Sequence, residues 1–339
     1  MSTSSRKVSW GILSTAKIGV EKVIPAMQRG EFCDVVALAS RSEEKARTAA
    51  EKLGIVKAYG SYEALLVDPE IDAIYNPLPN DQHVPWSIKA LEAGKHVLCE
   101  KPIGLSAAEG RKLADAADKY PHLKVMEAFM YRHHPQWKLA KSLIKSGKIG
   151  TLKTIQTFFS FFNDDPHNIR HDPAMGGGGL MDIGCYAISL SRWLFDLEPA
   201  RVLAHVEIDP NWGVDRMASA ILDFGNGGSA TFTCSMAVTA YQSVQIIGTE
   251  GRIELSEVPF NAPTNLPCAL KVQRNFGEIE RIEVETCNQY TIQGDLFSKA
   301  IREDSPVPTP IVDAIRNMDT IEAIFAAGKS GTWVVPNQS

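Results

Sequence analysis

The chain has 339 residues, 44% of them hydrophobic, and a formal net charge of -5 at pH 7. This length predicts two domains, and the composition is that of an ordinary globular protein. The acidic balance argues against a nucleic-acid partner, and no run of eighteen apolar residues predicts a membrane span. The six cysteines form no C-x-x-C pair, so we expect buried thiols in a reducing compartment, the cytoplasm.

Residues 1–128 alternate between strand-like and helix-like segments. Short apolar runs of the kind found in buried parallel strands are separated by amphipathic segments with helical spacing. The expected strands are Val8–Leu13, Val35–Ala39, Ile71–Tyr75, His96–Cys99 and Lys124–Ala128, and the expected helices are Ala16–Arg29, Glu43–Leu53, Gln82–Ala93 and Ala107–Lys119. This alternation predicts a first domain of α/β class, residues 1–128, with a doubly wound parallel sheet.

After Pro135, strands follow one another with few helices between them. The expected strands are Leu152–Phe162, Val202–Ile208, Met217–Phe224, Ser229–Ser235, Ser243–Ile247, Ile253–Leu255, Leu270–Gln273 and Ile279–Val284, and the expected helices are Trp137–Lys145, Leu180–Phe195, Thr291–Ile301 and Ile311–Ala327. The pattern predicts a second α/β domain, residues 129–339, with a large, mostly antiparallel open sheet. A second subunit would cover an apolar face of that sheet, so we expect a homodimer or homotetramer.

The first strand-to-helix turn indicates a nucleotide site. A G-x-G-x-x-G fingerprint would fall on Ser14, Ala16 and Gly19, so only its last glycine is present. Serine and alanine are small enough to keep the turn tight, which lets backbone N–H groups reach a pyrophosphate. The cofactor-binding residues expected here are Ser14, Thr15, Ala16, Lys17 and Ile18. The alternative is an ordinary turn between a strand and a helix.

The end of the second strand favours one nicotinamide cofactor over the other. An NAD site often has an acidic residue here for the ribose 2′-hydroxyl, whereas this chain has Ser40 and Arg41. A guanidinium can bind a 2′-phosphate through two hydrogen bonds and stack on adenine. We therefore predict NADP, with NAD as the alternative if Arg41 is only a solvated residue at a helix start.

Two further loops lie at the carboxyl ends of expected parallel strands, where open α/β sheets bind ligands. One holds Pro79, Asn80 and His83, in which the proline stiffens the loop and Asn80 can donate to a ribose or carboxamide, although asparagine also caps helices. The other holds Glu100 and Lys101. An ammonium buried beside a cofactor can lose proton affinity and take part in proton transfer. We expect all five residues to bind the cofactor and Lys101 also to be catalytic.

A glycine run, Gly176–Gly179, opens the strongest helix of the second part. Asp182 and Tyr186 are four residues apart and share one helical face, which also holds Ser189. Glycines allow other backbone or a ligand to approach closely, and a phenol near a lysine ammonium has a lowered pKa that suits acid–base catalysis. The alternative is helix capping by Asp182 and core packing by Tyr186.

These motifs together resemble a known family. Ser14–Gly19, Pro77–His83, Glu100–Pro102 and Gly177–Tyr186 have the order and nearly the spacing seen in the glucose–fructose oxidoreductase/inositol dehydrogenase/MocA family. The resemblance covers essentially the whole chain. The segment Met126–Pro135 resembles the branch with NADP-linked xylose dehydrogenases and dimeric dihydrodiol dehydrogenases.

The resemblance implies a Rossmann domain and an α/β domain with an open sheet, with the active site between them. It also implies residue roles: Lys101 matches the catalytic lysine, Asp182 the substrate-binding aspartate and Tyr186 the proton donor and acceptor. Arg170 is a further candidate for binding substrate hydroxyls. No metal is expected, because His167 and the nearby histidine lie in a proline-bounded loop that fixes no common face.

The function expected from these residues is NADP-dependent hydride transfer between nicotinamide and a sugar, either an aldose or a related cyclic polyol or diol. Tyr186 would take the hydroxyl proton and Lys101 would tune that phenol and stabilise developing oxyanion charge. Two alternatives stay open: an NAD-dependent glycosidase of the same family, and a noncatalytic regulator that senses the nucleotide.

Overall fold

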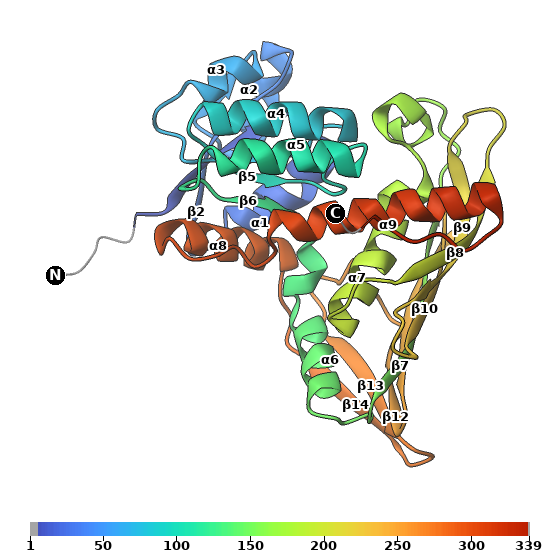
Figure 1. Ribbon diagram of the computed structural model, residues 1–339. Helices are drawn as coiled ribbons and strands as arrows, with labels where there is room; N and C mark the ends of the chain where they lie inside the picture. The colour runs from blue at the N-terminus through green and yellow to red at the C-terminus, as the bar shows by residue number, and fades with distance from the viewer. Residues whose placement is uncertain (1–5, 338–339) are drawn as a thin grey trace. The chain divides into compact units, whose positions relative to one another are not determined.

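The structure is a computed structural model that describes residues 6–337, and these form two compact units (Figure 1). The first unit contains the described residues up to Met130 together with Gln289–Ile315. The second contains Tyr131–Asn288 and the chain from Arg316 onward. The sequence predicts that residues 129–339 form the second domain. In the structure, Gln289–Ile315 belongs to the first unit instead.

The first unit is built on a six-stranded sheet in which every neighbouring pair is parallel. Its strands, in sheet order, are β3 (Lys57–Tyr59), β2 (Cys33–Ala39), β1 (Val8–Leu13), β4 (Ala73–Asn76), β5 (His96–Cys99) and β6 (Val125–Glu127). The order reverses between β1 and β4, and open α/β sheets bind ligands at such a switch point. The predicted doubly wound parallel sheet is confirmed.

Helices connect these strands, and serines cap several of them. The helical segments are η1 (Gly19–Val23, a π-helix), α1 (Ile24–Met27), α2 (Glu43–Leu53), α3 (Tyr62–Leu66), α4 (Asn80–Glu92), α5 (Ala107–Asp118) and α8 (Gln289–Arg302). The side chains of Ser42, Ser61 and Ser106 each accept a backbone N–H from the first turn of α2, α3 and α5. Such caps satisfy N–H groups that have no partner inside the helix.

Long-range packing explains why α8 belongs to the first unit. Phe297 is fully buried, and its ring lies 5.6 Å from that of Trp10 on β1. The Trp10 indole nitrogen donates to Ser298 Oγ at 3.1 Å, and the carboxylate of Asp295 accepts the N–H of Phe32 at 2.8 Å. These contacts join residues more than 260 positions apart, so no local pattern reveals them.

The second unit contains an eight-stranded sheet, and its predicted, mostly antiparallel character is confirmed. Its strands, in sheet order, are β14 (Ile279–Val284), β13 (Cys268–Arg274), β12 (Gly251–Leu255), β11 (Ala237–Gly248), β7 (Leu152–Phe162), β10 (Ser229–Ser235), β9 (Asp215–Asp223) and β8 (Arg201–Ile208). Only β7 and β10 are parallel neighbours among these strands. On β7, Ile155 and Thr157 are buried while Gln156 between them is exposed, as expected for a sheet covered on one face.

The helical segments of the second unit include α6 (Pro135–Lys145), the π-helix η5 (Leu180–Gly184) and α7 (Cys185–Phe195). The helix α9 (Ile311–Ser330) contains the point, between Ile315 and Arg316, at which the chain passes back from the first unit to the second. None of the helices within 6–337 is both long and apolar enough to cross a bilayer. All six cysteines are free thiols, and five of them are buried.

Replacing Phe297 tests the assignment of α8 to the first core. Phe297→Ala removes a fully buried ring and should lower the free energy of unfolding by about 3–5 kcal/mol. Lys299→Ala, on the exposed side of the same helix, should change it by less than about 0.5 kcal/mol. Urea unfolding of the full chain measures both, and equal effects would show that α8 does not pack in this core.

Candidate active site

The turn after β1 has the shape of a nucleotide-binding turn despite its missing glycines. Ser14 adopts a left-handed conformation, with φ of 81°, which glycine would adopt without strain. Its N–H donates to the carbonyl of Ala39 at 2.9 Å, and its Oγ accepts the N–H of Ala16 at 3.2 Å. Thr15 is partly exposed, so the turn lies open at the switch point of the sheet. The residues present therefore fit a dinucleotide.

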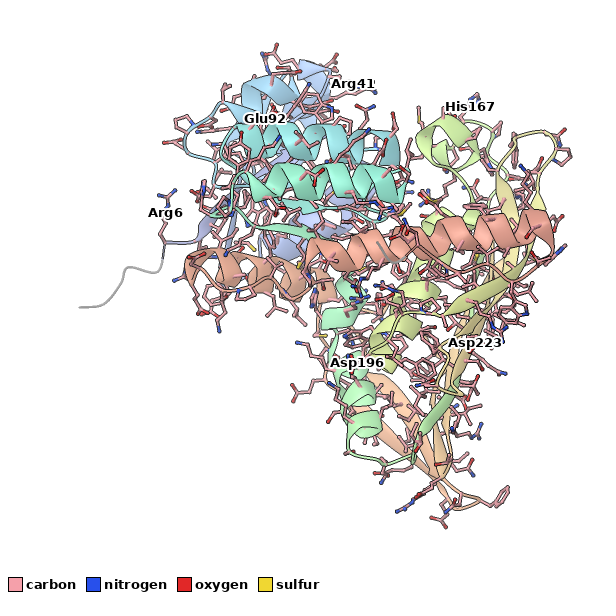
Figure 2. All side chains as sticks on the ribbon, in the orientation of Figure 1. Arg6, Arg41, Glu92, His167, Asp196 and Asp223 are labelled. Atoms are coloured by element: carbon pink, nitrogen blue, oxygen red, sulfur yellow. The ribbon has the colours of Figure 1, made fainter. Side chains whose placement is uncertain are left out.

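Ser40 and Arg41 lie at the carboxyl end of β2. Ser40 is buried, and its Oγ accepts the N–H of Ser42 at 3.3 Å, which shapes the start of α2. Arg41 is exposed (Figure 2). Burial raises the pKa of the nearby Tyr62 phenol, and the positive charge of Arg41 partly lowers that pKa again. The guanidinium is thus accessible at the strand end where a 2′-phosphate would bind.

His83 has a positioning role that the sequence pattern does not show. Its ring is buried, with Nδ1 at 2.7 Å from the carbonyl of Pro102 and Nε2 at 2.7 Å from that of Leu78. Burial lowers the pKa of His83 to about 4, so the neutral ring donates to one carbonyl at a time. The ring therefore joins the loop after β4 to the loop after β5. Pro79 and Asn80, at the start of α4, stay candidate cofactor contacts.

Lys101 is the second residue after β5, in the second of these loops. The preceding residue, Glu100, accepts a hydrogen bond from the hydroxyl of Tyr75 at 2.6 Å. Burial raises the pKa of Tyr75 well above its usual value and Glu100 adds to this, so the phenol keeps its proton. Burial is the main cause of the lowered pKa of His83, and the charge of Lys101 also contributes to it.

In the second unit, the structure brings Arg170, Asp182 and Tyr186 together. Arg170 Nε donates to Asp182 Oδ2 at 2.6 Å, and Nη2 lies 3.4 Å from Oδ1. Asp182 raises the pKa of Arg170, and Tyr186 acts in the same direction. The predicted helix over 180–195 is present, but its first five residues, including Asp182, form the π-helix η5. The side chain of Arg170 is 39% exposed and that of Asp182 15%, so a ligand could reach the pair.

Aromatic rings surround Tyr186. Its side chain is 5% exposed, and its ring centroid lies 5.6 Å from Tyr131, 5.7 Å from Phe159 and 5.4 Å from Phe260. The ring therefore packs in the core, as one interpretation of the sequence predicts. Core packing does not exclude a catalytic hydroxyl, because a tyrosine can bury its ring and present its polar end.

Three further side chains hold α7 in place. Tyr131 Oη lies 2.7 Å from Ser189 Oγ, and Arg132 Nη2 donates to the same hydroxyl at 2.8 Å. Asn317, on α9, donates to the carbonyl of Cys185 at 3.2 Å. Tyr131 and Arg132 lie in the segment that carries the family resemblance, whereas Asn317 is 132 residues from its partner and has no local signal.

The glycine run lets the backbone of another segment lie close against it. A Cβ on Gly177 would lie 2.5 Å from the carbonyl oxygen of Arg170, too close for any other residue. Gly178 donates its N–H to the same carbonyl at 2.9 Å. These contacts hold the backbone of Arg170 against the start of η5, within reach of Asp182. The run thus shapes the site by letting two segments touch.

His171 near this loop has a packing role. Its ring lies against Trp212, with ring centroids 3.6 Å apart, and its Nε2 lies 3.4 Å from Asn163 Oδ1. Over the part of the chain that the structure describes, no group of three or more His, Cys, Asp or Glu side chains is placed to hold a metal ion.

Comparisons with known proteins match both units. A family model described as "Oxidoreductase family, NAD-binding Rossmann fold" matches residues 8–129, and a "GFO/IDH/MocA C-terminal domain" model matches residues 137–254. The chain is 38% identical to the D-xylose 1-dehydrogenase (NADP(+)) 2 of Haloferax volcanii, over 96% of this chain and 98% of that protein.

The chain is also 34% identical to the trans-1,2-dihydrobenzene-1,2-diol dehydrogenase of Bos taurus, over 76% of each protein. Among solved structures, it resembles KijD10, a 3-ketoreductase from Actinomadura kijaniata, in complex with NADP and TDP-benzene. That similarity has a TM-score of 0.89, with 26% identity over 95% of this chain and 98% of that one. The branch indicated by the sequence motifs is confirmed, and the chain belongs to the GFO/IDH/MocA family of oxidoreductases with an NAD-binding Rossmann domain.

Proposed function

We propose that this enzyme transfers a hydride between NADP and a hydroxyl-bearing carbon of a sugar or a related cyclic polyol or diol. The observation that carries the proposal is the Arg170–Asp182 pair beside Tyr186. A guanidinium donates and a carboxylate accepts, so together they can orient neighbouring hydroxyls of one substrate. A phenol next to such a pair is suited to exchange a proton with a third hydroxyl.

The proposed roles of the chain's own residues follow from this chemistry. Asp182 and Arg170 bind hydroxyls that do not react. Tyr186 takes the proton of the reacting hydroxyl, and its aromatic neighbours limit the access of water to that phenol. The Lys101 ammonium stabilises the phenolate and the negative charge that develops on the substrate oxygen. Nicotinamide, when bound, accepts the hydride.

We propose that Ser14, Thr15, Ala16, Lys17 and Ile18 hold the pyrophosphate, and that Ser40 and Arg41 select NADP over NAD. The left-handed Ser14 and the exposed Arg41 support this assignment. The name of the xylose dehydrogenase relative and the NADP-bound 3-ketoreductase structure also support it. Six free thiols support a reducing compartment, so we place the enzyme in the cytoplasm.

Reduction of NADP by a sugar tests the proposal directly. We expect absorbance at the NADPH band to rise with at least one member of a panel of aldoses that includes D-xylose, inositols and cyclic diols. Release of nitrophenol from a nitrophenyl glycoside without net NADPH would indicate the glycosidase reaction instead. Tight NADP binding with no turnover across the panel would indicate a nucleotide sensor.

Two substitutions test the residue roles with the substrate found in this way. Tyr186→Phe should lower kcat by roughly 10²–10⁴, which is the usual contribution of acid–base catalysis. Lys101→Met should abolish turnover, whereas NADP should still bind to the variant. Lys112→Met, an exposed lysine on α5, is the matched control. Near-normal kcat in either of the first two variants would remove that residue from the mechanism.

The cofactor preference depends on Arg41. Arg41→Ala removes a charged contact to the 2′-phosphate and should raise the KM for NADP roughly 10- to 100-fold, with little effect on the KM for NAD. Arg47→Ala, an exposed arginine on α2 that pairs with Glu43, is the control and should leave both values unchanged. A wild-type enzyme with a tenfold preference for NAD would contradict the assignment.

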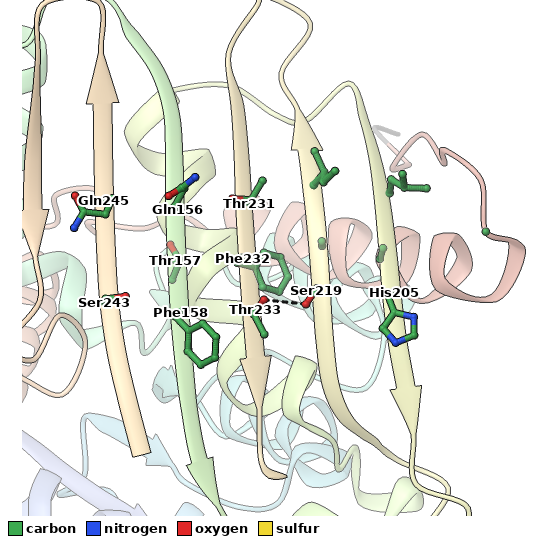
Figure 3. Close-up of a pocket in the computed structure, with 15 residues that line it drawn as sticks. Gln156, Thr157, Phe158, His205, Ser219, Thr231, Phe232, Thr233, Ser243 and Gln245 are labelled. Atoms are coloured by element: carbon green, nitrogen blue, oxygen red, sulfur yellow. Dashed lines mark hydrogen bonds between the residues drawn. The ribbon is translucent and has the colours of Figure 1, made fainter. Parts of the chain in front are cut away.

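We further propose that the uncovered face of the eight-stranded sheet binds a second copy of the chain, giving a homodimer or homotetramer. A shallow hollow lies across the strands on this face, and Phe158 is among the residues that line it (Figure 3). Ser219 and Thr233 hydrogen-bond to each other there at 2.8 Å, so their hydroxyls are satisfied within the sheet. Ile221, 39% exposed, adds apolar surface that a partner would bury.

A charge on this face should prevent the assembly. Ile221→Asp should convert the oligomer to a monomer in sedimentation equilibrium without changing the Kd for NADP, because a buried unpaired carboxylate at an interface is costly. Val56→Asp, at an exposed position of the first unit, should leave the mass unchanged. A monomeric wild type, or an Ile221→Asp variant of unchanged mass, would exclude this face.

A further inference from the structure

Asp215 is a buried acid that the proposed chemistry does not use. It begins β9, and its side chain is 1% exposed. Oδ2 accepts the N–H of Leu180, the first residue of η5, at 2.6 Å. Oδ1 is also buried and accepts no hydrogen bond from residues 6–337. A carboxylate kept in the core at this cost has a specific structural task.

A β-bulge aims Asp215 at the helix start. Ala218 and every second residue after it on β9 are buried, and by that alternation Arg216 would point into the core. The register changes instead at this end: Ile208 on β8 pairs with Asp215, and the preceding residue of β8 pairs with Met217. Arg216 is therefore the extra residue, and Asp215 takes the inward position. Bulges commonly redirect a side chain in this way near active sites.

The second half of the glycine run makes room for this carboxylate. A Cβ on Gly178 would lie 2.1 Å from Asp215 Oδ1, and a Cβ on Gly179 would lie 3.4 Å from Oδ2. Gly178 also has a φ of 110°, which other residues rarely adopt. The run thus receives the Arg170 backbone at Gly177 and the Asp215 carboxylate at Gly178, whereas Gly179 is only in ordinary contact with that carboxylate.

The carboxylate is connected to the proposed substrate-binding residues through the first turn of η5. Leu180, whose N–H it binds, lies two residues before Asp182. Asp182 donates its own N–H to the carbonyl of Gly178 at 3.1 Å and binds Arg170 with its side chain. A shift of this turn would move Asp182, and with it the orientation of Arg170 and Tyr186.

We propose that Asp215 is a positioning residue of the active site, whose carboxylate fixes the helical turn that carries Asp182 and leads into Tyr186. This inference rests on the proposed function, in which Asp182 and Tyr186 contact substrate. Asp215 touches neither substrate nor cofactor and acts through the backbone of Leu180.

The ionisation of Asp215 gives this role a pH dependence. Burial raises the pKa of Asp215 to about 6, Asp182 adds to the rise, and the amides of Leu180 and Gly179 oppose it. The ionisable groups that face the carboxylate are Asp182 on η5 and the buried Cys234 thiol on β10. Arg216, its neighbour on β9, pairs with Asp209 instead.

Stability and turnover should consequently change in opposite directions below pH 7. A carboxyl whose folded pKa lies above its unfolded value binds more protons in the folded state, so protonation of Asp215 stabilises the fold as the pH falls through about 6. The same protonation weakens the charge-assisted hydrogen bond to Leu180 and loosens the turn. A residue that only stabilised the fold would instead make turnover follow stability.

The variant Asp215→Asn imitates the protonated acid. We expect kcat for the substrate identified above to fall roughly tenfold at pH 8, with the KM for NADP unchanged within about twofold and the step in kcat near pH 6 absent. Asp223→Asn, at the other end of β9, is the control (Figure 2). Asp223 also accepts a backbone N–H, that of Gly225 at 2.9 Å, and should leave kcat and its pH profile unchanged.

Hydrogen exchange of the full chain without substrate separates this inference from the proposed function. In Asp215→Asn, the amides of residues 179–186 should exchange roughly tenfold faster than in the wild type, while the rest of the chain keeps its rates. If that variant does not fold, the wild type should show the same local loss at pH 5 relative to pH 7.5, after correction for intrinsic exchange. Unchanged exchange in this segment would overturn the inference, as would wild-type kcat with an unaltered pH profile.

Discussion

The ion pair between Arg170 and Asp182 is the interaction on which the geometry of the second unit's site depends. It joins a loop that has little regular structure to the first turn of a buried helix, through one contact of 2.6 Å and another of 3.4 Å. A partly buried pair of this kind costs desolvation on both sides, so it holds only when the backbones place the two charges within reach. Much of the surrounding structure supplies that placement.

The supporting contacts come from distant parts of the chain. Gly177 lets the Arg170 backbone approach, Asn317 donates to the carbonyl of Cys185, and the hydroxyls of Ser189 and Tyr131 share a hydrogen bond. The contacts of Asn317 and Ser189 give hydrogen-bond partners to polar groups in the interior. The helix start is therefore fixed by several independent contacts, and a substrate would meet hydroxyl-binding groups that are already oriented.

The sequence predicts the fold well where the signal is local. Apolar runs predict the parallel strands of the first unit except the short β3, and β7 has the predicted limits, Leu152–Phe162. The placement of α8 could not be predicted, because it depends on the packing of Phe297 against Trp10 across almost the whole chain. Amphipathic spacing shows that a helix has a buried face, but it does not show which core receives that face.

The same division applies to the candidate site. Lys101 and the Asp182–Tyr186 pair are recognisable because their spacing ties them to a strand end and a helix start. Asp215 has no such signal. It points inward only because of a β-bulge, which the alternation of buried and exposed residues along β9 does not predict. For His83, the type of residue suggests a ligand contact, whereas its two carbonyl neighbours show that it holds loops together.

The conformation of Ser14 bears on how proteins of this kind can be found. A left-handed backbone at a residue with a side chain costs roughly 1–2 kcal/mol, and here two hydrogen bonds on Ser14 help to offset it. Residues that tolerate this φ can therefore replace one another at position 14 without moving the backbone amides that follow. The property that this turn requires is a direction of the main chain. Distant homologues with other residues at this position should be recognisable by that direction.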